Sequence, residues 1–286
     1  MLQLVNDKNR QLNIVKTETT LDTGFTENTV NISRELFDSI KSNAVKNNSS
    51  LNEFLQSHSS VKQFLSKINY TFNNSTLLMQ ALTHRSFIHE FDSISNTNNE
   101  KLEFVGDSIV GAVVATKLFC DYPVLSEGQL SKFRGALVNE DSLADLGSIV
   151  LVPEIVMVGK GEFKTDGYKR PSIISDCFEA IIGAIYFDSS FEKAQSVLEH
   201  IFDLYTSDRN TPFISEDRLN DFDSKTKFQE LTTKKFKTLP KYAAIQLPDQ
   251  SFQVTLFVGQ EEVATVTDVS KKRAQKRLAQ IGLNKL

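Results

Sequence analysis

The sequence predicts a mainly α-helical protein, in which an all-helical body is followed by a small module with the order helix, three strands, helix. Two observations indicate this. From residue 32 to about residue 205, apolar residues recur at helical spacing and no stretch shows the alternation typical of a strand. From residue 224 onward, three short stretches rich in β-branched and aromatic residues lie between two helical ones, with turn residues separating them.

Four segments are expected along the 286 residues, a length that suffices for one large domain or two smaller ones. Residues 1–69 form an N-terminal extension with short helices between 32 and 68, and its first 29 residues or so are polar and expected to be flexible. The helical body covers 70–205. A polar, charge-rich linker at 206–223 then leads to the small module at 224–286.

The body is expected to contain four main helices, and the module two helices and three strands. The body helices fall at 77–87, 102–119, 130–146 and 173–188. The second and fourth are apolar nearly all round, which is typical of the middle of a bundle or of a subunit interface. In the module, strands are expected at 242–247, 252–258 and 262–269, between helices at 225–235 and 271–286.

Charge is distributed unevenly along the chain, although the formal net charge is only −4. Residues 224–286 hold 12 Lys and Arg against 5 Asp and Glu, and the remainder holds 20 against 31. A basic module is therefore attached to an acidic body. Basic patches bind phosphate backbones, whereas an acidic body either repels them or binds cations.

Several classes of protein are disfavoured by what the sequence lacks. No run approaches the roughly 18 apolar residues that a membrane span needs, and the N-terminus lacks the apolar core of a signal peptide. We expect an intracellular protein, nuclear or cytoplasmic, that is not secreted. Cys120 and Cys177 lie in apolar stretches and are expected to be packed, reduced thiols. The histidines have no metal-ligand spacing: His58, His84, His89 and His200.

Carboxylates interrupt the two most apolar helices. Glu100, Glu103 and Asp107 are spaced i, i+3, i+7 and share one helix face, while Asp176 and Glu179 stand three apart at the head of the other helix. Carboxylates are costly to bury unless they are paired or bind a metal, and like charges one turn apart repel each other. Some further interaction must offset that cost.

Three interactions could offset it, and spacing alone leaves all three open. Acids in the first turn of a helix stabilise its dipole, which spacing favours for Asp176 and Glu179. Salt bridges to distant Lys or Arg are a second explanation. Binding of a hard divalent cation is the third, because Mg²⁺ prefers carboxylate oxygens.

The strings around these acids are more specific than their spacing. LLMQALTHRSF at 77–87, NNEKLEFVGDSIVG at 98–111, SEGQLSKFRGALVNEDSLADLG at 126–147 and SDCFEAIIGAIYFD at 175–188 occur in this order. Together they resemble the ribonuclease III family over about 70–205. The segment 224–286 is similar to the double-stranded-RNA-binding domain that commonly follows in that family.

The resemblance implies a double-stranded-RNA endonuclease that works as a homodimer. It implies two Mg²⁺ ions per site, which Mn²⁺ can replace, and hydrolysis that leaves 3′-hydroxyl and 5′-phosphate ends with short 3′ overhangs. The positions that match the family's motifs have these implied roles: Glu103, Asp107, Asp176 and Glu179 as the catalytic metal ligands, Glu127 as a further acid at the metal site, Glu100 outside the direct ligands, and Phe104 at the dimer interface.

In the module, the resemblance implies contacts of two kinds with duplex RNA. Gln229 and Glu230 match the first helix, which faces the minor groove, and Lys271, Lys272 and Lys276 match a phosphate clamp at the start of the last helix. The alternative for the lysines is a solvated helix face. The loop at 247–251 reads LPDQS and lacks the histidine usual in the family, which puts that contact in doubt.

The extension before residue 70 is similar to that of fungal members, including the ribonuclease III and the Dicer-like enzymes of budding yeasts. Processing of structured RNA precursors and production of small interfering RNA are the implied roles. The alternative is a non-catalytic double-stranded-RNA-binding or ribosomal protein that kept the fold. Such relatives lose acids of the metal set, and this chain retains all of them. A pure dimerisation scaffold would leave the acids unexplained.

Overall fold

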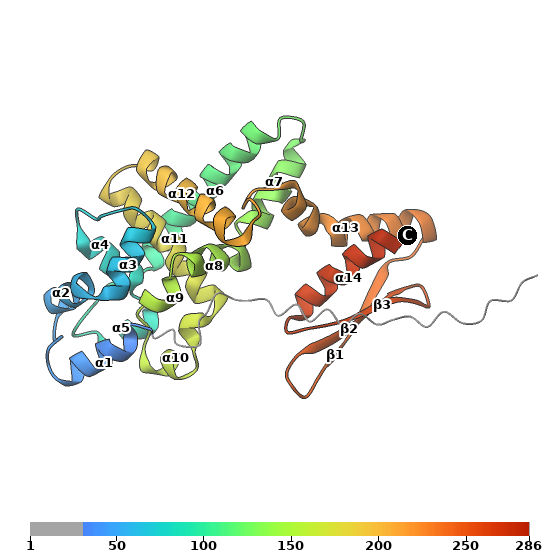
Figure 1. The fold of residues 1–286 in the computed structure, drawn as a ribbon. Helices are drawn as coiled ribbons and strands as arrows, with labels where there is room; N and C mark the ends of the chain where they lie inside the picture. Colours follow the sequence, from blue (N-terminus) through green and yellow to red (C-terminus); the bar gives the residue numbers. More distant parts are fainter. Residues whose placement is uncertain (1–30, 286) are drawn as a thin grey trace, which may run out of the picture.

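The computed structural model describes residues 31–285, except for some side chains in the helices at 216–236 and 271–285. The stretch expected to be flexible, about 1–29, lies outside the described residues. Figure 1 shows the helical body and the small C-terminal sheet with its two helices. The fold class predicted from the sequence is confirmed.

The N-terminal extension forms three short helices, α1 (Ser33–Lys41), α2 (Asn48–Ser57) and α3 (Ser59–Lys67). Their apolar faces enter the same core as the body, with Leu36, Leu51 and Phe64 fully buried. The Asn31 amide donates to the carbonyls of Pro153 and Val156, at 2.7 and 2.9 Å. The extension is therefore packed onto the body.

The helices of the body are shorter and more numerous than the sequence pattern suggests. They are α4 (Ser75–Leu82), α5 (Arg85–Phe91), α6 (Glu100–Asp121), α7 (Glu127–Leu137), α8 (Glu140–Ile149), α9 (Val152–Ile155), α10 (Lys160–Lys164), the 3-10 helix η1 (Gly167–Lys169), α11 (Pro171–Asp188) and α12 (Phe191–Arg209).

Two of the expected helices, 77–87 and 130–146, are each broken in two. Thr83 and His84 are extended, and Thr83 forms an isolated bridge to Met157. Asn139 is also extended, and its side chain accepts a hydrogen bond from the Ser142 amide. This bond caps the start of α8. Tertiary pairing and capping thus override an uninterrupted apolar period.

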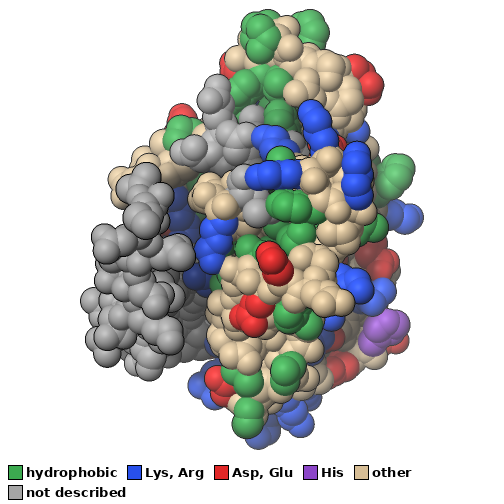
Figure 2. Space-filling view, turned by 90° about the vertical axis from the view of Figure 1, so that its right-hand side faces the viewer, with side chains coloured by type: hydrophobic (Ala, Val, Ile, Leu, Met, Phe, Trp, Pro, Cys, Tyr) green, Lys and Arg blue, Asp and Glu red, His purple; other side chains and the backbone are tan. Residues whose placement is uncertain are grey.

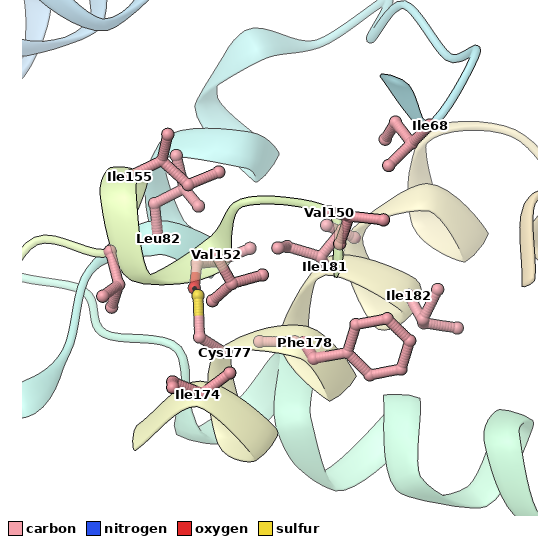
Figure 3. Packing of buried hydrophobic residues seen from close by; sticks show 14 of the residues in the cluster. Ile68, Leu82, Val150, Val152, Ile155, Ile174, Cys177, Phe178, Ile181 and Ile182 are labelled. Atoms are coloured by element: carbon pink, nitrogen blue, oxygen red, sulfur yellow. Dashed lines mark hydrogen bonds between the residues drawn. The ribbon is translucent and has the colours of Figure 1, made fainter. Parts of the chain in front are cut away.

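Helix α11 lies at the centre of the core. Cys177, Phe178, Ile181 and Ile182 are all buried. In Figure 3, Cys177 points toward Leu82 of α4 and Val152 of α9, and Ile181 lies beside Val150. Cys177 is packed as expected, but Cys120, near the end of α6, is exposed, so that part of the thiol prediction is wrong. In the described part of the chain, no helix is long and apolar enough to cross a bilayer.

The expected linker at 206–223 is mostly helical. α12 continues to Arg209, and α13 (Glu216–Phe236) begins well before the predicted start of the next helix. Phe213, in the short connection, is buried, and the Arg218 guanidinium lies 4.5 Å from its ring centroid. Arg218 also donates to the Ser142 hydroxyl at 3.2 Å. The stretch is polar apart from this aromatic residue, so its composition predicted a linker and did not reveal that Phe213 is buried.

The C-terminal module has an antiparallel sheet in the order β1 (Pro240–Gln246), β2 (Phe252–Val258), β3 (Glu261–Asp268). α13 and α14 (Lys271–Lys285) pack on the sheet around a second core. Phe228 of α13, Val254 and Leu256 of β2 and Leu278 of α14 are fully buried there. The three strands fall where the sequence predicted, within two residues at each end.

Candidate metal centre and nucleic-acid interface

Two glycines bring the acid-bearing helices together. A Cβ at Gly106 of α6 would collide with the Glu179 carbonyl of α11, and a Cβ at Gly183 would collide with the Leu102 carbonyl. The backbones therefore touch at this crossing, which only residues without a side chain permit. Glu103 lies one turn before Gly106 on α6, and Glu179 lies one turn before Gly183 on α11, so the close crossing brings these two acids near each other.

Three of the predicted ligands converge at the crossing. Carboxylate oxygens of Glu103, Asp176 and Glu179 lie within 4.8 Å of one another. Glu179 is buried, and Glu103 and Asp176 are half-buried. Three carboxylates at this spacing in a partly desolvated position repel one another strongly unless a cation or protons intervene.

The titration behaviour of these acids reflects that repulsion. Burial, reinforced by Asp107, Glu103 and Asp176, raises the pKa of Glu179 from 4.5 to about 8. Burial and the charges of Asp176, Glu100 and Asp107 raise the pKa of Glu103 to about 7, partly opposed by Arg85. The pKa of Asp176 is raised chiefly by burial, against a hydrogen bond from Ser175. Among the described residues, no basic side chain lowers the pKa of Glu179.

Of the three explanations left open by the sequence, cation binding fits this geometry best. Asp176 and Glu179 lie in the second and third turns of α11, which starts at Pro171, so the helix dipole acts on them weakly. The donors are all carboxylate oxygens, as a hard divalent cation requires. These residues fit Mg²⁺: Glu103, Asp176 and Glu179 would hold it.

The remaining predicted acids are placed differently. Asp107 is exposed beside the group and close enough to raise the pKa of Glu179. Glu100 is exposed and its carboxylate lies 3.7 Å from the Arg85 guanidinium. Glu127 begins α7, is exposed and accepts a hydrogen bond from Ser131, so one chain does not place it in the group of three acids. Its role at the metal stays a prediction.

Sequence reasoning missed several residues next to the acids. Glu140, at the start of α8, lies near enough to Asp176 to raise its pKa, after burial itself. A pocket of about 550 Å³ shares Glu103 and Asp176 with the acid group and is also lined by His84, Arg85, His89 and Arg170. The string THRS at 83–86, with two adjacent nitrogen donors in His84 and Arg85, is the sequence signal for this pocket.

An exposed stripe runs along α6 on the side away from the core. Phe104 is 76% exposed and Phe119 is 71% exposed, and between them Ser108, Ala112 and Thr116 are exposed as well. Large aromatic side chains flanking small residues on an exposed helix face are typical of an interaction surface. The residue predicted to lie at a dimer interface is thus available for one.

The C-terminal module presents several of its predicted RNA contacts to solvent. Gln229 and Glu230 on α13 and Lys271 at the start of α14 are exposed, and Lys276 is half-buried. The side chain of Lys272 lies outside the described residues. Figure 2 views the protein from the side of this module, and Lys and Arg side chains lie at several places across that face. The 247–251 loop is a closed turn, with Asp249 accepting from the Ser251 amide and hydroxyl.

Comparison with known proteins agrees with the resemblance seen in the motifs. The family described as Ribonuclease-III-like matches residues 74–204. The Ribonuclease 3 of Borreliella burgdorferi is 35% identical over 79% of this chain and 91% of its own length.

Two solved structures are also similar to parts of this chain. The nuclease domain of ribonuclease III from Campylobacter jejuni is 36% identical, with a TM-score of 0.48, over 55% of this chain and all of that one. A Dicer from Pichia stipitis is 21% identical, with a TM-score of 0.32, over 75% of this chain and 96% of that one. The matching motifs and the identity over most of a relative's length lead to one conclusion: this chain belongs to the ribonuclease III family and is an endoribonuclease.

Proposed function

We propose that the protein cleaves double-stranded RNA with Mg²⁺, as a homodimer, and leaves 3′-hydroxyl and 5′-phosphate ends with short 3′ overhangs. The observation that carries this proposal is the convergence of Glu103, Asp176 and Glu179 at a helix crossing where the described part of the chain offers Glu179 no basic partner. Such a group is unfavourable without a cation and well suited to holding one.

Each acid has a distinct part in the proposed site. Glu179, buried on α11, and Glu103 on α6 face the same point and would bind the cation directly, together with Asp176. Asp107, on the exposed side, would hold a second ion or a water bound to it. Mg²⁺ held there would supply Lewis-acid chemistry for phosphodiester hydrolysis. The carboxylates hold and orient these groups without becoming nucleophiles.

The C-terminal module would supply affinity for the duplex. A-form RNA is recognised by its shape, its 2′-hydroxyls and its phosphates. The exposed positions of Gln229, Glu230 and Lys271 support minor-groove and phosphate contacts there. Because the 247–251 turn lacks the usual histidine, we propose that this module grips the duplex mainly through α13 and α14.

Dimerisation would proceed through the exposed stripe on α6. The described residues of one chain contain one such acid group, so we propose that a staggered cut of both strands requires two chains. The exposure of Phe104 and Phe119 supports this face as the contact. Phe104 would pack against the partner, and it is the neighbour in sequence of the proposed ligand Glu103.

We also propose that the protein belongs to the fungal subgroup of the family. The relatives named above at 35–36% identity are bacterial, and the subgroup rests on the extension α1–α3, which packs on the body. We propose a Dicer-like or precursor-processing role in that subgroup. The non-catalytic alternative is disfavoured because the acids are present and converge.

A cleavage assay tests the proposal. A long RNA duplex is incubated with the protein in Mg²⁺, in Mn²⁺ and in EDTA, next to a single-stranded RNA of the same sequence. Cleavage of the duplex alone, in either metal but not in EDTA, with 5′-phosphates on the products, is the expected result. Binding without any cleavage would favour the non-catalytic alternative.

A further inference from the structure

The pocket beside the metal acids contains a set of hydrogen-bond donors that the proposed reaction does not yet use. Its volume of about 550 Å³ falls in the range of clefts that hold small ligands, about 300–1,000 Å³. Four acids line one part of it: Glu100, Glu103, Glu162 and Asp176. The rest of the lining is Ser86, Ser172, Ile173 and five nitrogen donors, which are His84, Arg85, His89, Asn99 and Arg170.

Two arginines stand at this pocket, each beside an acid. The Arg170 guanidinium lies 2.9 Å from a Glu162 carboxylate oxygen, without hydrogen-bond geometry, and donates to the Thr165 hydroxyl at 3.0 Å. Arg85 lies 3.7 Å from Glu100, which is too long for a hydrogen bond. Both guanidiniums are at least half exposed, so they keep donors free to face a ligand.

Asn99 supplies an independent indication of a ligand. The residue is 2% exposed and lines the pocket, yet the nitrogen of its side-chain amide, Nδ2, has no hydrogen-bond partner. Asn99 precedes α6, where asparagine ordinarily caps the helix, but its side chain makes no capping bond. A buried donor without an acceptor is unfavourable and rare. An acceptor oxygen brought by a ligand would satisfy it.

His84 adds a second neutral donor, and its tautomer follows from its neighbours. The Gly159 amide donates to the Ser86 hydroxyl oxygen at 2.9 Å, so that hydroxyl can donate to Nδ1 of His84, 2.8 Å away. The Ser86 amide donates to the same Nδ1 at 3.3 Å. Nδ1 is thus an acceptor, and in the neutral ring the proton sits on Nε2. Burial lowers the pKa of His84, which favours the neutral ring.

We propose that this pocket binds a phosphate of the strand being cut, next to the phosphate that is hydrolysed, with Arg85 and Arg170 as cations and Asn99 and His84 as neutral donors. The proposal rests on the proposed function, because the shared wall of Glu103 and Asp176 places the pocket beside the reacting phosphate. Guanidiniums match phosphate geometry, and the hydrogen-bond donors in the part of the pocket away from the acids suit an anion that only accepts hydrogen bonds.

Synthetic duplexes with one neutral methylphosphonate test this directly. Four duplexes are made, each with the substitution at one position: the first or second phosphate before the cleaved bond, or the first or second phosphate after it. KM and kcat are measured for each with Mg²⁺. For the wild type, one position should raise KM about tenfold, the effect of losing a charge-assisted hydrogen bond. For Arg170→Gln, KM should already be raised on the normal duplex, and that methylphosphonate should add little.

Two variants complete the design. Arg34→Gln, an exposed arginine on α1 that does not line the pocket, controls for the change in net charge and should behave as wild type. Asn99→Leu removes the unsatisfied donor, so it should keep or raise thermal stability while it slows cleavage, whereas a purely structural Asn99 would lose stability.

The possible failures are distinguishable. If the wild type does not cleave the unmodified duplex, the proposed function fails. If the wild type cleaves but the effects of Arg170→Gln and of the methylphosphonate are additive at all four positions, the phosphate pocket is wrong while the nuclease assignment stands.

Discussion

Gly106 of α6 and Gly183 of α11 face each other so closely that a Cβ built on either one would lie 3.1 or 3.2 Å from the backbone nitrogen of the other and would collide with a neighbouring carbonyl. This contact fixes how close the two acid-bearing helices come. It also couples a stability requirement to a functional one, because the same crossing positions Glu103 and Glu179.

Gly106→Ala should therefore damage both stability and metal binding. A Cβ at this position meets backbone atoms, which cannot rotate away, so we expect a loss of about 3 kcal/mol in the free energy of unfolding, typical of severe overpacking. Gly135→Ala is the matched control, because nothing lies near its Cβ on α7 and a helical Gly→Ala change stabilises by about 0.5–1 kcal/mol. Urea unfolding of both variants checks this. Equal stability of the two would show that the helices can separate freely.

The stability of the metal-free protein should fall as the pH rises from about 4.5 to about 8. In the unfolded chain Glu179 titrates near 4.5, and in the folded protein its pKa is about 8. A raised pKa means that the folded state binds the proton more tightly, so this contribution is complete below pH 4.5 and is lost as the pH passes 8. Glu103, with a pKa of about 7, acts in the same direction.

Thermal melting with EDTA and with Mg²⁺ measures this. Mg²⁺ should raise the melting temperature strongly at pH 8 and little at pH 5, because protons compete with the cation. Glu179→Gln should flatten the pH dependence in EDTA. An equal Mg²⁺ effect at both pH values would argue against cation binding by these acids.

Much of this site follows from the sequence, and the rest depends on contacts between distant segments. The apolar stretches predicted α6 and α11, and the motif strings identified their acids. The phosphate pocket could not be predicted, because it depends on the break at Thr83 and His84 and on the pairing of Thr83 with Met157. The linker prediction missed α13 for a similar reason, since Arg218 packs on Phe213 and Ser142.

Phe104→Asp should weaken the dimer without unfolding the monomer. Phe104 is 76% exposed in one chain, so it contributes little to the core. Loss of one interface hot spot of about 2 kcal/mol would weaken association about thirtyfold. Analytical ultracentrifugation across a concentration series measures the dimer constant. Ile245→Asp on β1, also exposed, is the control and should leave it unchanged. Identical sedimentation of the two variants would place the dimer contact elsewhere.

Removal of residues 216–286 should weaken duplex binding and reduce its dependence on salt. The cut at Ser215 keeps Phe213 in the body and avoids a truncated α13. Each lost phosphate contact lowers the slope of log K against log salt by about 0.9, and Lys271→Gln should lower it by about that amount. Filter binding at several salt concentrations gives the slopes. An unchanged slope for the truncated chain would assign RNA binding to the body.

The most direct test of the central claim compares cleavage and binding in Glu179→Gln and Asp107→Ala. Glu179→Gln removes a carboxylate of the acid group and Asp107→Ala removes the exposed carboxylate beside it, whereas Glu53→Gln changes an exposed acid on α2 and serves as the control. With a long RNA duplex and Mg²⁺, the first two should show no cleavage and the control should match the wild type. In EDTA all should bind the duplex with similar affinity. Cleavage by Glu179→Gln and Asp107→Ala at the wild-type rate would contradict the assignment of the metal site to these acids.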